Sequence, residues 1–268
     1  MSGEVHGLAA FYARPHGQVA ARLIGARLVA LWPDCSGLDL LGLGWAQPYL
    51  GLWARQPGRR IALVPASFGP ARGCALTDDH DLPLPDRSLD RILLVHGLEA
   101  SERARHLLRE CWRVLRDDGR LLVVAPNRLG WWSFFEHTPF GQGRPYSQGQ
   151  LARLLESQFF RVRRREAALF VPPFPWALAL AGARLWEMGG RALARRFAGV
   201  AMVEAEKDLF AALPAGAAAA AARRVVAPLP ASYARAGGGP PGQRNLPGSL
   251  IRSARSQARK PRVTRAAM

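Results

Sequence analysis

The sequence has few cysteines and almost no lysine. Three cysteines occur among 268 residues, and Cys35, Cys74 and Cys111 are far apart and form no CxxC pair. This spacing predicts neither a disulfide framework nor a metal site, and it fits a reducing cytoplasm. Lysine accounts for only two of the 37 basic residues, Lys207 and Lys260. Such an arginine bias, together with alanine and glycine tracts, indicates the base composition of the coding genome more than a selected binding surface.

A long apolar run is also missing. The best candidate, residues 167–183, contains three prolines and is followed by Arg184, which argues against a membrane span. The first ten residues lack a basic segment followed by an apolar core, so no secretory signal is predicted. We therefore expect a cytoplasmic protein.

Acidic residues are absent after Asp208, whereas ten basic residues follow it, and the formal net charge of the chain is +17. A basic segment without interleaved aromatic residues is typical of a solvated appendage, so a nucleic-acid partner is disfavoured. The segment is also rich in alanine, glycine and proline. We predict a domain over residues 1–212 and a disordered basic tail over residues 213–268.

The centre of the sequence is a short apolar run that ends in two glycines, residues 38–44, followed by Pro48. This pattern predicts a strand, a tight turn and a helix with proline in its first turn. Such a turn can hold a ligand on exposed backbone N–H groups, or it can be a plain strand-to-helix connection. The third glycine of the dinucleotide fingerprint is replaced by Gln47, which disfavours a nicotinamide or flavin enzyme.

Apolar periodicity predicts alternating strands and helices along most of the chain. This alternation favours parallel strand pairing and a doubly wound α/β sheet. Gly119 is expected to cap the helix before it, and Ser147 with Gln150 reads as a capping box. An aromatic, glycine-rich loop over residues 126–146 is expected at the ligand-binding edge. Strands are predicted at 38–44, 60–64, 74–77, 92–95, 121–124, 159–170 and 199–205, and helices at 5–32, 102–116, 148–157 and 176–197.

Three motifs, in this order, are more specific than the periodicity: Asp78-x-x-Asp81-Leu82-Pro83-Leu84-Pro85, His96-Gly97-Leu98-Glu99 and Arg109-Glu110-Cys111-Trp112-Arg113-Val114-Leu115. With them the chain resembles a class I S-adenosylmethionine-dependent methyltransferase related to the ubiquinone and menaquinone methyltransferases, over residues 38–207. Its glycine turn and the segment 138–147 resemble an uncharacterised proteobacterial subgroup. The resemblance implies a Rossmann-like, mostly parallel seven-stranded sheet with an antiparallel last strand, a helical insert at about 175–197, and S-adenosyl-L-methionine as cofactor.

The resemblance also suggests where the cofactor would bind. An acid after the third strand would accept a hydrogen bond from adenine, although Asp there can equally cap a turn. Two acids that the family normally has are missing: Leu40 replaces the one before the glycines, and residues 64–67 lack the one that holds the ribose. Each missing charged hydrogen bond weakens binding by about 1.5–3 kcal/mol. The proposed cofactor contacts are Gly42, Gly44, Trp45, Ser67, Asp78, Asp79 and His96.

Methyl transfer needs alignment above all, and a general base only when the acceptor carries a proton. His96 is the candidate base, but it can also merely line the cleft. Glu99 is expected at the start of the next helix. The aromatic loop would hold an anionic small-molecule or lipid-like acceptor, or simply close the edge of the sheet. The candidate acceptor residues are Arg128, Trp131, Trp132, His137, Arg144 and Tyr146.

Two functions follow from these patterns: a methyltransferase, or a protein of the same fold that binds partners without catalysis and contacts a membrane surface through residues 174–176. The second is favoured if Trp45 or Tyr49 fills the space meant for the cofactor. Gly44→Val is predicted to abolish cofactor binding and to leave the thermal transition in place. The oligomeric state is not predictable from these patterns.

Overall fold

The fold is taken from a computed structural model of the chain. It describes residues 3–69, 73–78, 81–135, 138–171, 187–190 and 197–209, and all of them belong to one compact unit, Met1–Ala221. The predicted tail, 213–268, and most of the predicted helical insert lie outside the described residues.

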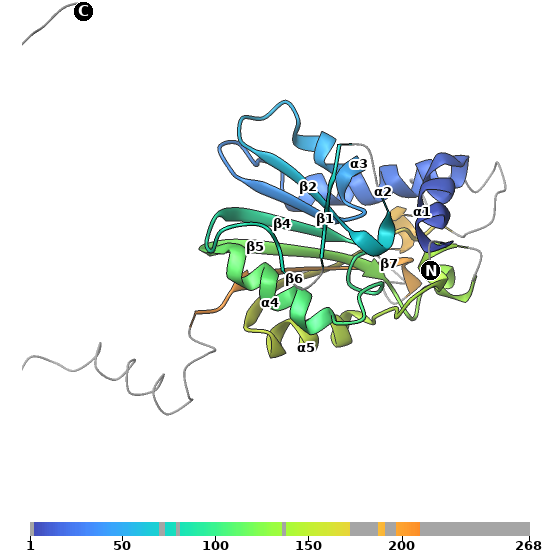
Figure 1. The fold of residues 1–268 in the computed structure, drawn as a ribbon. Coiled ribbons are helices and arrows are strands. Elements are labelled where there is room, and N and C mark those ends of the chain that lie inside the picture. Colours follow the sequence, from blue (N-terminus) through green and yellow to red (C-terminus); the bar gives the residue numbers. More distant parts are fainter. Residues whose placement is uncertain are drawn as a thin grey trace, which may run out of the picture. The chain divides into compact units, whose positions relative to one another are not determined.

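A seven-stranded sheet forms the centre of this unit (Figure 1). The strand order is β3-β2-β1-β4-β5-β7-β6, with parallel pairing from β3 to β5. β7 runs antiparallel to both β5 and β6, which confirms the predicted doubly wound sheet and its antiparallel last strand. The strands are β1 (Leu40–Gly44), β2 (Arg60–Pro65), β3 (Ala75–Thr77), β4 (Leu89–Val95), β5 (Leu115–Pro126), β6 (Phe160–Ala168) and β7 (Val200–Lys207).

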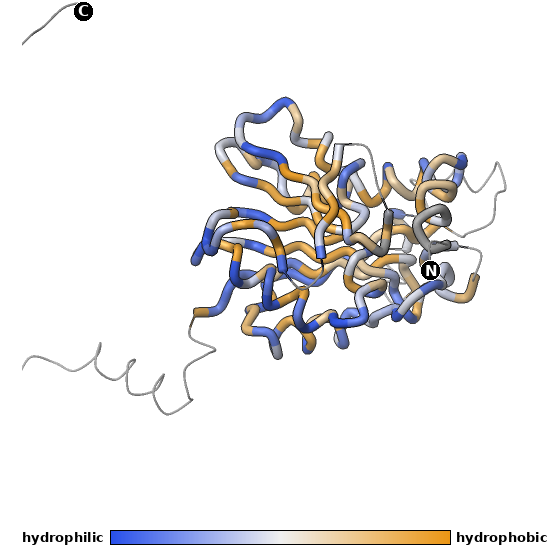
Figure 2. The backbone as a smooth tube through the Cα atoms, viewed as in Figure 1, coloured by the Kyte–Doolittle hydropathy of each residue, from blue (hydrophilic) through white to orange (hydrophobic). Residues whose placement is uncertain are grey.

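Helices cover both faces of the sheet, because alternate residues of each central strand point to opposite sides. Leu40 and Leu93 pack with helix α2 (Pro15–Leu31) on one face. Leu41 and Leu94 pack on the other face with α4 (Ala104–Val114) and α5 (Gln148–Ser157). The tube coloured by hydropathy shows the central strands as the most apolar part of the described chain (Figure 2). These strands are buried on both faces, and for this reason they read as continuous apolar runs.

The predicted single helix over residues 5–32 is in fact two helices, α1 (Gly3–Ala13) and α2. Arg14 has extended backbone angles at the N-cap of α2, and Pro15 follows at its first position. The break has a local cause, since a residue before proline is pushed out of the helical region. It allows α1 to leave the direction of α2 and to reach the carboxyl ends of the strands.

Two of the predicted helix starts, after the glycine turn and at the capping box, are present in the structure. The glycine turn leads into a four-residue helix, α3 (Gln47–Leu50), followed by a 3-10 turn, η1 (Gly51–Trp53). α5 (Gln148–Ser157) begins at the predicted capping box, in which both reciprocal hydrogen bonds are present. Short 3-10 turns also occur after β2 and within the aromatic loop, at η2 (Ala66–Phe68), η3 (Trp131–Phe134) and η4 (Pro139–Gly141).

Gly119 does not cap the fourth helix, contrary to the prediction. α4 (Ala104–Val114) ends at Leu115, which already has extended backbone angles, and β5 starts there. The pairing of β4 with β5 then shifts, so that Leu89 opposes Leu115 whereas Arg91 opposes Arg120. The residues between Leu115 and Arg120 form an irregularity inside β5. Gly119, which the sequence predicted as a helix cap, is part of this irregularity.

Candidate active site at the carboxyl ends of β1 and β4

The order of the sheet reverses between β1 and β4, and the predicted turn lies at that point. Ligands of open α/β sheets bind in the crevice beyond the carboxyl ends of the strands at such a switch. β1 ends at Gly44 and β4 ends at Val95, followed by His96. The backbone N–H of Trp45 donates to the carbonyl oxygen of Val95 at 2.7 Å. The glycine turn and the histidine strand end are therefore joined directly.

The two glycines serve close packing within the protein. Gly44 has a φ of +76°, and a Cβ there would lie 2.3 Å from the carbonyl oxygen of Val95. A Cβ at Gly42 would lie 2.9 Å from the side chain of Leu50 in α3. These positions let β4 and α3 come close to β1, and their contact with a cofactor stays a prediction.

Trp45 occupies part of the space above the turn. Its ring packs against an apolar cluster of Leu8, Val64 and Phe68, which we name the rim cluster. It also stacks on Tyr12 of α1, with ring centroids 6.3 Å apart and planes inclined by 15°. Its indole Nε1 is buried and has no hydrogen-bond partner among the described residues. A buried donor without a partner is costly, so this N–H is available to a ligand.

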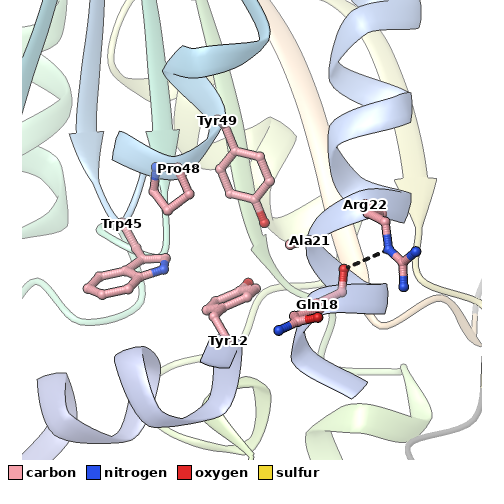
Figure 3. A pocket seen from close by; sticks show the side chains of 7 residues that line it. All are labelled: Tyr12, Gln18, Ala21, Arg22, Trp45, Pro48 and Tyr49. Carbon is pink, nitrogen blue, oxygen red and sulfur yellow. Dashed lines mark hydrogen bonds between the residues drawn. The ribbon is translucent and has the colours of Figure 1, made fainter. Parts of the chain in front are cut away.

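A cavity of about 500 Å³ remains beside the turn (Figure 3). Its volume falls within the range of small-molecule sites. Tyr49 is 3% exposed, and its hydroxyl has no hydrogen bond with suitable geometry among the described residues. Burial raises the pKa of Tyr49, so this phenol stays protonated at neutral pH. The cavity is lined by Tyr12 of α1, by Gln18, Ala21 and Arg22 of α2, and by Trp45, Pro48 and Tyr49.

His96 lies at the end of β4 in a buried chain of polar groups. Its Nδ1 is 2.8 Å from Oε1 of Glu99, and its Nε2 is 2.8 Å from the hydroxyl of Tyr12. The residue is 2% exposed and has a φ of +53°, a region that costs a non-glycine residue energy and that recurs at functional sites. The predicted base is therefore held between two partners. Burial is the main cause that raises the pKa of Tyr12 well above its ordinary value.

The predicted acidic contacts of the cofactor, Asp78 and Asp79, stay predictions. Asp78 is exposed at the end of β3, and Asp79 lies outside the described residues, as does the side chain of Ser67. Asp39 is held at the opposite, amino end of β1, where its carboxylate accepts from Arg59 at 2.7 and 2.8 Å. The end of β2 is followed by the buried ring of Phe68, and no carboxylate stands there.

The predicted acceptor residues are dispersed. Trp132 is 1% exposed and donates from Nε1 to the carbonyl oxygen of Val171, so its ring belongs to the core. Trp131 is 44% exposed. Arg128 and Arg144 are also exposed and Tyr146 is partly buried, while His137 lies outside the described residues. None of those described lines the cavity beside Trp45, and their role stays a prediction.

Three site residues were missed or misplaced from sequence. Glu99 was expected at a helix start, but α4 begins at Ala104 and Glu99 is buried against His96. The spacing of three residues in His96-Gly97-Leu98-Glu99 was a usable signal for this pair. Tyr12 was not among the predicted site residues, and Tyr49 was named only as a ring that could fill the space meant for the cofactor. Among the described residues, no group of three or more His, Cys, Asp or Glu is placed to hold a metal ion.

Comparisons with known proteins agree with this architecture. A family model described as a methyltransferase domain matches residues 62–123. A demethylmenaquinone methyltransferase of Thermotoga maritima is 45% identical over 47 residues, which are 18% of this chain and 20% of that protein. A probable S-adenosylmethionine-dependent methyltransferase of Mycolicibacterium smegmatis is 36% identical over 84 residues, or 31% and 32% of the two chains. The matched stretches of these relatives amount to less than a third of their length.

A longer stretch matches the ubiquinone/menaquinone biosynthesis C-methyltransferase of Rubrivivax gelatinosus. It is 29% identical over 121 residues, which are 41% of this chain and 48% of that protein. In these stretches the chain is similar to S-adenosylmethionine-dependent methyltransferases. Solved structures show a similar fold: a chain of the complex between the Haloferax volcanii Trm112 methyltransferase activator and the putative methyltransferase has a TM-score of 0.54 at 16% identity, covering 78% of this chain and 99% of that one.

A possible histamine N-methyltransferase of Thermotoga maritima also has a TM-score of 0.54 at 16% identity, covering 75% of this chain and 94% of its own. At this identity the likeness is one of fold alone. Within the described residues, no helix has both the length and the apolar character needed to cross a membrane.

Proposed function

We propose that this chain is an S-adenosylmethionine-dependent methyltransferase. The observation that carries the proposal is the cavity of about 500 Å³ beside the glycine turn, at the switch point of a methyltransferase-family sheet. A pocket at that place is where this kind of sheet binds small ligands. The whole protein's activity is inferred, since its curated relatives match over a fifth to about half of their length.

The residues at the turn fit this cofactor in part. The indole Nε1 of Trp45 and the hydroxyl of Tyr49 are buried donors without a geometrically suitable partner among the described residues, and they can hold its polar groups. S-adenosylmethionine supplies an electrophilic methyl group on a sulfonium sulfur. The two absent carboxylates weaken binding by about 1.5–3 kcal/mol each, so we expect low affinity. Gly42, Gly44, Ser67, Asp78, Asp79 and His96 remain proposed contacts.

The acceptor is proposed to be a small or lipid-like molecule. The quinone-biosynthesis methyltransferases among the relatives favour a small-molecule acceptor. Exposed Arg128 and Arg144 are available to an anionic group, and Trp131 offers an exposed apolar ring. These three residues are the proposed outer contacts of the acceptor.

Isothermal titration calorimetry of the full chain with S-adenosylmethionine and with S-adenosylhomocysteine tests the proposal. We expect saturable binding, and Trp45→Phe should weaken it about tenfold because an aromatic ring remains but the indole N–H is lost. Trp131→Phe is the matched control and should bind normally. No saturable binding at millimolar concentration would remove the enzyme hypothesis.

A second function, binding without catalysis, is favoured by the rim cluster. Leu8, Val64 and Phe68 pack with Trp45 at the carboxyl edge, where the family's ribose contact is missing. In this alternative α1 is a permanent cover and the protein serves as a scaffold. The same titration separates the two, since a scaffold binds neither nucleoside. The predicted membrane contact, residues 174–176, lies outside the described residues.

A further inference from the structure

The side chain of Tyr12 is a phenol that lies in the site, between Trp45 and His96. Its ring stacks on Trp45, with centroids 6.3 Å apart and an interplanar angle of 15°. Its hydroxyl is 2.8 Å from Nε2 of His96. Tyr12 and His96 are 84 residues apart in sequence, so the contact is made by packing α1 across the edge of the sheet. One side chain thereby combines an aromatic stacking contact with a hydrogen bond to a histidine.

The direction of the hydrogen bonds follows from the partners. An ionised carboxylate only accepts, so the contact with Glu99 at 2.8 Å keeps a proton on Nδ1 of His96. Nε2 of the neutral ring is then the acceptor, and the Tyr12 hydroxyl is its donor. Burial supports this assignment, because it raises the pKa of Tyr12 and keeps the phenol protonated. The arrangement matches the acid–histidine pair that serves as a base in other enzymes.

The His96 ring is fixed by its surroundings. Phe140 contacts it edge-on, with ring centroids 5.3 Å apart, and the side chains of His96 and Glu99 are 2% and 4% exposed. The second carboxylate oxygen of Glu99, Oε2, is buried and has no hydrogen-bond partner among the described residues. Glu99 is therefore placed to hold the orientation of the His96 ring.

Tyr12 has a place to move into. Its ring borders the cavity of about 500 Å³ between α1, α2 and α3 (Figure 3). A side chain that faces open volume can change its position without displacing packed core atoms. An acceptor ring could then replace that of Tyr12 against Trp45.

We propose that the acceptor is an aromatic hydroxyl compound whose hydroxyl takes the position of the Tyr12 hydroxyl, and that His96 is its general base. The O–H bond of the acceptor breaks, the proton forms a bond to Nε2 of His96, and the electron pair stays on the acceptor oxygen. Glu99 is a positioning residue that holds the tautomer of His96. This inference rests on the proposed methyltransferase function and names the class of acceptor.

The test uses the full wild-type chain with ¹⁵N-labelled histidine and no cofactor. Its probes are p-cresol, which is a simple phenol, and toluene, which has the same ring and methyl group without the hydroxyl. We expect an Nδ1–H tautomer for His96, assigned with His96→Gln, and a saturable shift of the Nε2 signal with p-cresol. Toluene should bind at least about tenfold more weakly, because it makes no hydrogen bond to Nε2.

Two variants separate a base from a structural contact. Tyr12→Phe removes the competing hydroxyl, so p-cresol should bind about tenfold more tightly. Glu99→Gln keeps the shape of the side chain but no longer enforces the Nδ1–H tautomer, and the Nε2 signal should move toward that of a protonated nitrogen.

The proposal is overturned if p-cresol leaves the His96 signals of the wild type unchanged at tens of millimolar, or if toluene binds equally well. It is also overturned if the wild type has an Nε2–H tautomer. Since no cofactor is present, these outcomes do not depend on the calorimetric test. Phenol binding without nucleoside binding would reject the methyltransferase and leave an aromatic-hydroxyl binding protein.

Discussion

At the scale of single residues, Gly44 and Gly69 have almost the same backbone conformation and very different surroundings. Their φ angles are +76° and +75°, but a Cβ at Gly44 would meet the Val95 carbonyl oxygen at 2.3 Å, whereas nothing lies within 4 Å of one at Gly69. Gly69→Ala should therefore cost only the strain of a positive φ, about 1–2 kcal/mol. Gly44→Ala should cost at least about 2 kcal/mol more, because the strands must separate.

Urea denaturation of both variants measures this difference. Equal losses of stability would mean that β1 and β4 can separate without a loss of free energy. Close strand packing would then not explain the glycine at position 44, and a contact with a ligand would be the better explanation. The same geometry replaces the earlier expectation for Gly44→Val. A branched side chain at that position is predicted to destabilise the fold, so its effect on cofactor binding would not be interpretable.

Asp39 gives a prediction on pH. The Arg59 guanidinium, and then Arg116, lower the pKa of this carboxyl from 3.8 to about 2. A depressed pKa in the folded state adds stability above the unfolded value, and this stability is lost as the pH falls through the folded value. The free energy of unfolding should thus be higher for the wild type than for Asp39→Asn above pH 4, with the gap closing between pH 4 and 2.

Denaturant titrations at several pH values, with the exposed Asp118→Asn as control, measure this gap. The control should stay close to the wild type throughout. A gap between the wild type and Asp39→Asn that persists at pH 2 would show that the contribution of Asp39 is not electrostatic.

At the scale of elements, the start of α5 is set by two reciprocal hydrogen bonds. The Ser147 hydroxyl accepts from the Gln150 N–H, and the Gln150 side chain accepts from the Ser147 N–H. Ser147→Ala should lower the free energy of unfolding by about 1 kcal/mol. Ser157→Ala, at the exposed far end of the same helix, is the matched control and should lie within about 0.5 kcal/mol of the wild type. If both changes cost the same, the cap contributes nothing specific.

Elements defined by local chemistry were predictable from sequence. The capping box needs residues only three positions apart, and the buried parallel strands show as short apolar runs. Gly119 was misread because a glycine near a helix end is compatible with both a C-cap and a strand irregularity. The pairing of Leu115 with Leu89 decides in favour of the strand irregularity. This contact joins residues far apart in the sequence, so local patterns do not reveal it. The break at Arg14 was within reach, since Pro15 disfavours a helical residue before it.

The site was predictable only along the strands. The end of β4 placed His96 beside the glycine turn, because parallel strands end at the same edge. Its partner Tyr12 is not predictable in this way, since α1 reaches the site only after it turns away from α2. The role of Gly44 was also hidden, because a positive φ fits a ligand cradle and a close strand contact equally well. Sequence patterns locate an edge of the sheet, and side-chain packing decides what fills it.

At the scale of the described molecule, the sheet edge that should bind ligand is covered by α1. The rim cluster joins Leu8 of α1 to Val64 and to Phe68 of η2, and Trp45 packs against it. The phenol of Tyr12 adds a polar contact to His96. A ligand that extends from the cavity beside Trp45 over the ends of β1 and β2 must therefore compete with the contacts of α1 in the rim cluster. That part of the site is accessible only when α1 leaves the edge of the sheet. A ligand that binds the protein better with α1 displaced therefore shifts the equilibrium toward that state.

Hydrogen exchange detects this equilibrium in the full chain. With saturating S-adenosylhomocysteine, amides of α1 should exchange faster, because the ligand replaces the contacts of Leu8 and Tyr12, while amides of α5 on the opposite face should be unchanged. Slower exchange in α1 would mean that the ligand enters the cavity beside Trp45 without opening the rim cluster. Unchanged exchange in α1, despite binding measured by calorimetry, would place the ligand away from this edge and would contradict the proposed cofactor site.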